Sequence, residues 1–130
     1  MSKVAIVHSG YYPEIIENLI DGINKDIDKS FELSTFKVPG SWDIVYKINT
    51  LSKEYKIFIA VGVICKGETD HYEYISNAVA NGLINLSINK SVYIANCVLN
   101  VHNLDQAKKR SENNNNKGSE AAKAINLLFT

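Results

Sequence analysis

The sequence lacks the features that would assign it to several common classes of protein. Its 130 residues carry fourteen basic and fourteen acidic side chains, so no excess of positive charge is available for nucleic acid or an anionic membrane. No apolar run approaches the roughly 20 residues that a membrane-spanning helix needs. A strand is predicted almost at the N-terminus, which leaves no room for a signal peptide. We therefore expect one cytoplasmic domain over residues 1–130, without nucleic-acid or membrane partners.

Cysteine and arginine are also scarce. Cys65 and Cys97 fit no C-x-x-C or metal-binding spacing and lie at or in predicted strands, so we expect buried, reduced thiols. The chain has thirteen lysines but a single arginine, Arg110. A lone arginine indicates a position that needs the planar, bidentate guanidinium, as for a phosphate or carboxylate. A chance occurrence on the surface is the alternative.

What the sequence does contain is a regular alternation of strands and helices. Apolar runs and alternation predict strands at residues 4–8, 31–38, 57–64 and 91–99. Helical spacing and Pro13 predict helices at 13 to about 25, through 42–48, from about 71, at 103–110 and at 119 to about 128. Such alternation is typical of right-handed βαβ units, and it predicts an α/β fold with a four-stranded parallel sheet between helices.

The segment at residues 57–74 is the most informative about chemistry. It runs from a buried strand through a polar loop, and Asp70 with Glu73 matches a capping box, so a helix should begin near His71. Ligands of open α/β sheets bind outside the carboxyl ends of the strands, and N–H groups at a helix start bind anions. Because histidine exchanges protons near neutral pH, His71 is a candidate acid and base.

Other strand ends should bring further residues to the same edge. Tyr11 and Trp42 each offer a flat face to a planar heterocycle, although packing in the core is the alternative. Asp43 could bond a hydroxyl-rich group or only favour its helix start. His8 and His102 have no supporting motif. The asparagine-rich segment 111–118 is interpreted as a solvated, helix-breaking loop, since asparagine tolerates unusual backbone angles.

Four motifs in order resemble the lumazine synthase family. The segment Val38-Pro-Gly-Ser-Trp-Asp43 corresponds to V-P-G-A-F-E, and Lys66-Gly-Glu-Thr-Asp-His-Tyr-Glu-Tyr74 corresponds to R-G-x-T-x-H-[FY]-[DE]-[YF]. Residues 105–110 and 116–122 correspond to E-Q-A-x-x-R and N-K-G-x-E-A-A. Each motif alone is moderately specific, but their order and spacing cover nearly the whole chain. The fold expected is a flavodoxin-like three-layer α/β/α sandwich.

The resemblance implies a transferase of riboflavin biosynthesis that needs no cofactor and no metal. It would condense 5-amino-6-(D-ribitylamino)uracil with 3,4-dihydroxy-2-butanone 4-phosphate into 6,7-dimethyl-8-ribityllumazine. His71 would transfer protons, and Arg110 and Lys117 would reach the site from the neighbouring subunit of a homopentamer. The implied pyrimidine and ribityl contacts are Tyr11, Ser41, Trp42, Asp43, Val63, Ile64, Cys65, Asn96 and Lys117; the implied phosphate contacts are Gly67, Glu68, Thr69 and Arg110.

The chain departs from the family pattern at several points. Asn96 stands where phenylalanine is common, and Tyr12 stands where asparagine is usual. The loop from Arg110 to Lys117 is slightly shorter, and an N-terminal extension that pairs with a neighbour's sheet is missing, which leaves assembly beyond the pentamer open. Two other functions remain as alternatives. One is an archaeal-type riboflavin synthase, which generally lacks the G-x-T-x-H loop, and the other is a non-catalytic flavin-binding, lumazine-binding or shell protein.

Overall fold

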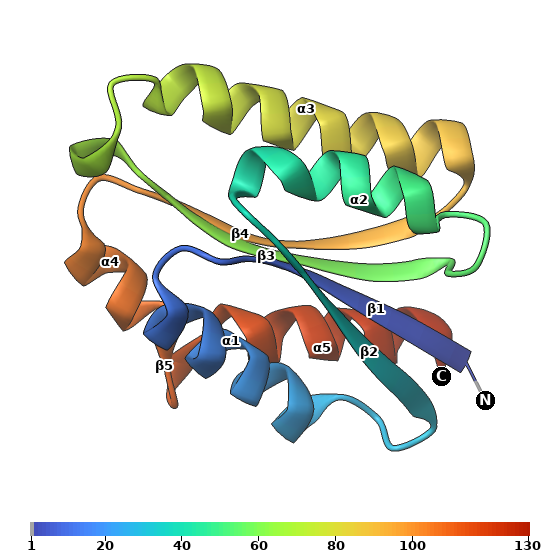
Figure 1. The fold of residues 1–130 in the computed structure, drawn as a ribbon. Helices are drawn as coiled ribbons and strands as arrows, with labels where there is room; N and C mark the ends of the chain where they lie inside the picture. The colour runs from blue at the N-terminus through green and yellow to red at the C-terminus, as the bar shows by residue number, and fades with distance from the viewer. Residues whose placement is uncertain (1) are drawn as a thin grey trace.

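A four-stranded parallel sheet forms the centre of the computed structural model, which describes residues 2–130 (Figure 1). Its strands lie in the order β2-β1-β3-β4. All three pairings are parallel: β1 with β2, in which Ser2 lies opposite Phe31, β1 with β3, and β3 with β4. The strands are β1 (Ser2–Ser9), β2 (Phe31–Val38), β3 (Ile57–Cys65) and β4 (Tyr93–Val101).

Helices cover both faces of this sheet and complete the three layers. Figure 1 shows α1 (Pro13–Asp26) and α5 (Lys117–Phe129) on one face, and α2 (Ile44–Leu51) and α3 (Tyr72–Lys90) on the other. The apolar side of α1 packs into one core with Ile125, and α2 and α3 pack with Val7 and Phe58 in the second core. Every residue of β3 is buried because both cores cover it. The predicted three-layer, flavodoxin-like fold is confirmed.

The predicted element boundaries hold closely in most places. The strand predicted at 31–38 matches β2 (Phe31–Val38), while β4 lies slightly further along the chain than the predicted 91–99. A short 3₁₀ turn, η1 (Ser41–Asp43), precedes α2, so Trp42 is not part of that helix. The short helix α4 (Leu104–Lys109) begins after Asn103, whose side chain accepts a hydrogen bond from the Gln106 N–H.

The capping box predicted at the start of α3 is wrong. The helix begins at Tyr72, with His71 at the capping position and no side-chain hydrogen bond to the first turn. Glu73 instead pairs with Lys66, whose Nζ lies 3.5 Å from its carboxylate. The Thr69 hydroxyl accepts a hydrogen bond of 3.1 Å from the His71 N–H. A second 3₁₀ turn, η2 (Lys66–Glu68), and these two contacts therefore shape the loop in place of the expected cap.

The asparagine-rich segment forms a small antiparallel hairpin, with β5 (Ser111–Glu112) paired to β6 (Asn115–Asn116). The prediction of a solvated loop is right for residues 113–115, which are exposed, but wrong for Asn116, which is buried. Unusual backbone angles do not explain these asparagines. The non-glycine residues with left-handed φ in the described chain are Tyr12 (53°) and Ser91 (54°).

Two expectations about individual side chains and helices can be compared with the fold. Cys65 and Cys97 are both buried and free, as predicted. None of the helices formed by residues 2–130 combines the length and the apolar character needed to cross a lipid bilayer.

Candidate functional site

A cavity of about 310 Å³ lies at the carboxyl ends of β1, β2 and β3. We call it the aromatic cavity. It brings together eight of the residues singled out from the sequence, although they come from three separate strand ends and the loops that follow them. Its lining consists of Tyr11, Tyr12, Gly40, Ser41, Trp42, Val63, Ile64, Cys65, Glu68, Thr69 and Ile75. The site therefore lies where an open α/β sheet ordinarily binds its ligand.

The floor of the aromatic cavity is rigid because it is the buried end of β3. Val63, Ile64 and Cys65 are each no more than 5% exposed. Ser41 lies beside them, and its hydroxyl is buried without a hydrogen-bond partner within residues 2–130. A buried hydroxyl without a partner costs about 1–3 kcal/mol, so it is a natural contact for a polar group of a bound molecule.

The turn that carries Trp42 is closed by Asp43. Its carboxylate accepts a hydrogen bond of 3.0 Å from the Gly40 N–H, and its own N–H donates to the Gly40 carbonyl at 3.0 Å. Asp43 itself does not line the aromatic cavity. The structure thus favours the local role of Asp43 over direct contact with a hydroxyl-rich ligand.

Two aromatic side chains stand open at the mouth of this cavity. Tyr11 is 63% exposed and Trp42 is 58% exposed, so neither is occupied by core packing. The Tyr12 ring lies 6.3 Å from that of Tyr11. Burial, reinforced by the nearby Glu68 carboxylate, raises the pKa of Tyr12 and keeps its phenol neutral. The cavity can therefore hold a planar ring between aromatic and apolar surfaces.

Three cavity residues were not singled out from the sequence as ligand contacts: Tyr12, Gly40 and Ile75. Tyr12 follows Tyr11 directly, and Ile75 belongs to the first turn of α3. Their positions in the sequence, next to predicted contacts, could therefore have indicated both as cavity residues. His71 and Gly67 line neither this cavity nor the one described next. Both are exposed at the rim, on the loop that also carries Thr69.

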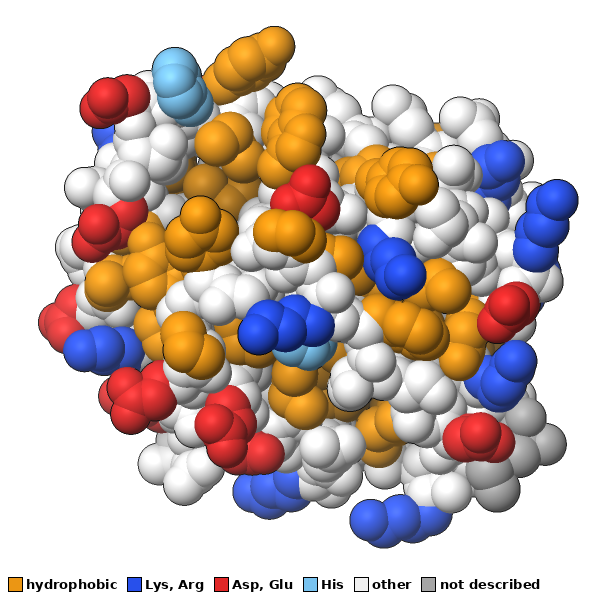
Figure 2. All heavy atoms as spheres, in the orientation of Figure 1, with side chains coloured by type: hydrophobic (Ala, Val, Ile, Leu, Met, Phe, Trp, Pro, Cys, Tyr) orange, Lys and Arg blue, Asp and Glu red, His pale blue; other side chains and the backbone are white. Residues whose placement is uncertain are grey.

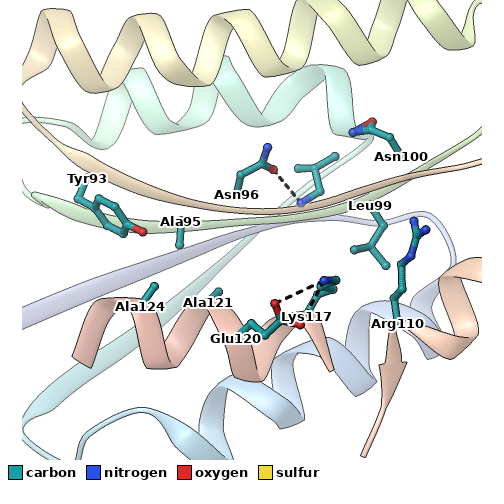
Figure 3. Close-up of a pocket in the computed structure, with 11 residues that line it drawn as sticks. Tyr93, Ala95, Asn96, Leu99, Asn100, Arg110, Lys117, Glu120, Ala121 and Ala124 are labelled. Atoms are coloured by element: carbon teal, nitrogen blue, oxygen red, sulfur yellow. Dashed lines mark hydrogen bonds and ion pairs between the residues drawn. The ribbon is translucent and has the colours of Figure 1, made fainter. Parts of the chain in front are cut away.

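A second cavity, of about 580 Å³, lies along β4 and α5 (Figure 3). We call it the Arg110 cavity. It contains the three remaining predicted contacts, Asn96, Arg110 and Lys117. Its lining consists of Tyr93, Ala95, Asn96, Val98, Leu99, Asn100, Arg110, Lys117, Glu120, Ala121 and Ala124. Across residues 2–130, no side chain lines both cavities.

The Arg110 cavity is lined by two cations and one carboxylate, Arg110, Lys117 and Glu120. Lys117 forms an ion pair of 3.2 Å with Glu120, as Figure 3 shows. Arg110 takes part in neither ion pair formed within residues 2–130, so its guanidinium is available to an external carboxylate or phosphate. Asn96 is exposed, and its amide oxygen accepts a hydrogen bond of 3.0 Å from the Val98 N–H.

Cys97 lies in the buried core close to these charges. Burial, reinforced by Glu120 and partly offset by Lys117, raises the pKa of its thiol to about 12. The thiol therefore stays protonated at neutral pH and is not a nucleophile. In the part of the chain that the structure describes, no three His, Cys, Asp or Glu side chains gather as metal ligands would.

Comparison with known proteins gives a single family. The sequence model described as 6,7-dimethyl-8-ribityllumazine synthase matches residues 1–129. The chain is 39% identical to the protein of that name from Wigglesworthia glossinidia brevipalpis, over 98% of this chain and 90% of the relative. It is 35% identical to the one from Zymomonas mobilis, over 99% and 95% of the two chains, and 35% identical to the one from Buchnera aphidicola, over 92% and 80%.

Proposed function

The chain belongs to the 6,7-dimethyl-8-ribityllumazine synthase family, and from that membership we propose how its two cavities share the reaction. The protein is a transferase of riboflavin biosynthesis. It condenses 5-amino-6-(D-ribitylamino)uracil with 3,4-dihydroxy-2-butanone 4-phosphate into the lumazine, phosphate and water. The relatives all carry the name of this synthase, so the riboflavin synthase and carrier alternatives are not favoured.

The pyrimidine substrate is assigned to the aromatic cavity. Tyr11 and Trp42 cover the faces of its ring, and Val63, Ile64 and Cys65 form the surface beneath it. The unpaired hydroxyl of Ser41 supplies a polar contact at the same level. This arrangement rests on the shape and exposure of the cavity, which suit a flat heterocycle with a polar edge.

The phosphate of the second substrate is assigned to the rim loop. Backbone N–H groups around Gly67 and Glu68 and the Thr69 hydroxyl can donate to its oxygens, as can the free groups at the start of α3. The Glu68 carboxylate repels an anion, so a cation is needed as well. We assign this role to Arg110, whereas Asn96 and Lys117, from the same cavity, are assigned to the pyrimidine and its ribityl chain.

His71 is assigned to proton transfer. The 5-amino group of the pyrimidine forms an imine with the ketone and releases one water, phosphate leaves, and the ring closes with loss of a second water. Holding two substrates together can supply about 7–11 kcal/mol of the barrier reduction, whereas one acid and base typically contributes about 10² to 10⁴-fold. Positioning therefore outweighs the contribution of His71 to the rate.

The observation that carries the proposal is the division of the site between two cavities without a shared residue. We propose that the Arg110 cavity of one copy meets the aromatic cavity of the next, so that the active site forms at the interface of a homopentamer. Large hydrophobic side chains exposed on α2 and α3 support an extensive contact between copies (Figure 2). They are Tyr46, Tyr74, Ile84 and Ile88.

Mixing two defective variants tests this arrangement. Arg110→Ala chains and His71→Ala chains are each impaired, but mixed assemblies contain interfaces at which both groups are intact. We expect lumazine formation, followed by absorbance, to rise well above that of either variant alone. If mass measurement shows mixed assemblies and the activity does not rise, the two residues act from one chain and the interface site is wrong.

We also propose that residues 1–130 act as one domain in the cytoplasm. Both cores pack against the same sheet, which supports a single folding unit. Cys65 and Cys97 are unpaired, as is usual in a reducing compartment. Cell fractionation tests the location, and a single unfolding transition reported alike by fluorescence and circular dichroism tests the unit.

A further inference from the structure

The hairpin between α4 and α5 joins the two cations of the Arg110 cavity. Arg110 is the C-terminal capping residue of α4, and Lys117 is the first residue of α5. The N–H of Lys117 donates a hydrogen bond of 2.9 Å to the carbonyl of Arg110, and Ser111 pairs with Asn116 in the hairpin. The backbones that carry the guanidinium and the ammonium group are therefore fixed directly to one another.

Asn116 holds this junction in place with its side chain. Its amide oxygen accepts hydrogen bonds from the N–H groups of Gly118 (2.8 Å) and Ser119 (3.1 Å). Its amide nitrogen donates to the carbonyls of Ser111 (3.1 Å) and Asn18 (2.9 Å). Because an amide has two donors and one oxygen with two lone pairs, its bonding capacity is fully used. One buried side chain thus ties the hairpin, the start of α5 and helix α1 together.

Two glycines let the neighbouring helices approach closely around this amide. A Cβ atom at Gly22 would lie 2.3 Å from the Asn116 amide oxygen, and one at Gly118 would lie 2.0 Å from the carbonyl oxygen of Leu19. Helix α1 and the start of α5 therefore approach closely because neither of these positions carries a side chain. This close approach packs Asn116 between α1 and α5, and the hydrogen bonds of Asn116 in turn hold the hairpin.

We propose that Asn116 is a positioning residue for the reaction, which sets the placement of Arg110 and Lys117 without touching a substrate. It lines a separate hollow with Asn18, Gly22 and Ser111, not the Arg110 cavity. It therefore acts through the two cations. This inference rests on the proposed function, since it takes Arg110 as the phosphate contact.

The chain supplies a matched control at Asn126. Its amide also ties α5 to the end of α1, because its oxygen accepts from the Asp28 N–H at 2.8 Å and its nitrogen donates to the Asp26 carbonyl at 2.7 Å. Asn126 lies at the far end of α5 and lines neither cavity. A role confined to attaching α5 to α1 predicts the same consequences for both asparagines.

The test compares Asn116→Ser with Asn126→Ser in steady-state kinetics and in inhibition by inorganic phosphate. A serine at position 116 still caps α5 but cannot reach the carbonyls of Ser111 and Asn18. We expect Asn116→Ser to raise the KM for the butanone phosphate and the inhibition constant of inorganic phosphate by about tenfold, which corresponds to about 1.4 kcal/mol. The KM for the pyrimidine should change less, because only Lys117 links the hairpin to that substrate, and Asn126→Ser should leave all three constants near their original values.

Arg110→Ala, measured alongside, separates the possible failures. If Arg110→Ala leaves the KM for the butanone phosphate unchanged, the proposed phosphate site is wrong. If Arg110→Ala raises it but Asn116→Ser behaves like Asn126→Ser, only the positioning role is overturned. When both changes are combined, Asn116→Ser should add little to the effect of Arg110→Ala, since it acts through that side chain. Asn116→Thr is a second variant at the same position. If neither Asn116→Ser nor Asn116→Thr folds, the positioning role is overturned in favour of a structural one.

Discussion

The aromatic cavity and the Arg110 cavity are built in different ways. The first lies over three strand ends, and its floor is a β3 segment that is covered on both faces. The second lies along β4, which is the last strand of the sheet, and its two cations stand at the ends of α4 and α5. The sheet fixes the first cavity, whereas one hairpin and one buried asparagine fix the cations of the second.

This difference separates the two halves of the proposed site in their response to mutation. Changes around the hairpin should affect handling of the phosphate substrate most, while leaving the pyrimidine contacts of the aromatic cavity intact. Changes at Tyr11 or Trp42 should do the reverse. Substitutions at His71, which lines neither cavity, and then at one residue of each cavity test this separation.

His71→Ala is expected to give the largest effect, a fall in kcat of about 10² to 10⁴-fold. Pyrimidine binding should stay nearly intact because the aromatic cavity does not include His71. Stopped-flow turnover together with equilibrium binding of the ribitylaminouracil checks both points. An unchanged kcat would remove His71 from the mechanism, and a matching loss of pyrimidine affinity would place it inside the cavity.

Arg110→Ala tests the second cavity alone. We expect the KM for the butanone phosphate to rise by an amount equivalent to about 2–5 kcal/mol, because truncation removes a charge-assisted contact. Arg110→Lys keeps the charge but loses the bidentate geometry, so its effect should be smaller. Lys123→Ala, an exposed change on α5, is the control. A comparable rise in the KM for the pyrimidine would contradict the separation of the two halves.

Tyr11→Ala tests the first cavity alone. Loss of ring stacking should weaken binding of the ribitylaminouracil by about 1–3 kcal/mol, on the scale known for bases stacked on aromatic side chains. Tyr11→Phe keeps the ring and should retain most of the affinity. Calorimetry measures both variants. If Tyr11→Ala binds as tightly as the unchanged protein, Tyr11 does not contact the pyrimidine.

Cys97 gives the smallest expected effect at neutral pH, because its contribution is a dependence of stability on pH that begins only near pH 9. Its pKa rises from the usual 9.0 to about 12 on folding. The folded state therefore holds a proton that the unfolded state releases above pH 9, and the free energy of unfolding should fall by about 1.4 kcal/mol per pH unit toward pH 12. Urea unfolding at several pH values should show a shallower fall in Cys97→Ala, and parallel curves would contradict the assigned thiol.

The two cavities also differ in how far the sequence predicted them. Residues 57–64 form an unbroken apolar run, which identifies a strand buried on both faces wherever the rest of the chain lies. The loop that follows such a strand has a predictable position, so the contacts around Val63 and Thr69 came together as expected. Periodicity and strand ends are local signals, and this cavity depends mainly on them.

The second cavity depends on contacts that no local pattern records. Asn116 was interpreted as part of a solvated loop, although an asparagine directly before a helix is also a preferred cap. Its bond to the Asn18 carbonyl joins residues 98 positions apart in the sequence, so only the packing of α1 on α5 creates it. The start of α3 near His71 was predicted correctly, but the capping box was not, since Glu73 pairs with Lys66 rather than with the helix end.

The packing of α1 against α5 also sets an order in time. The layer of α2 and α3 needs no residue beyond β4, so its core can form before α5 is in place. The buried face of α1, including Ile15, Leu19 and Ile23, has its helical partner only once α5 has docked. A chain in which α5 has not yet docked therefore exposes an apolar helix face. Molecular chaperones that bind exposed hydrophobic segments should meet this protein at α1, and release should coincide with the docking of α5.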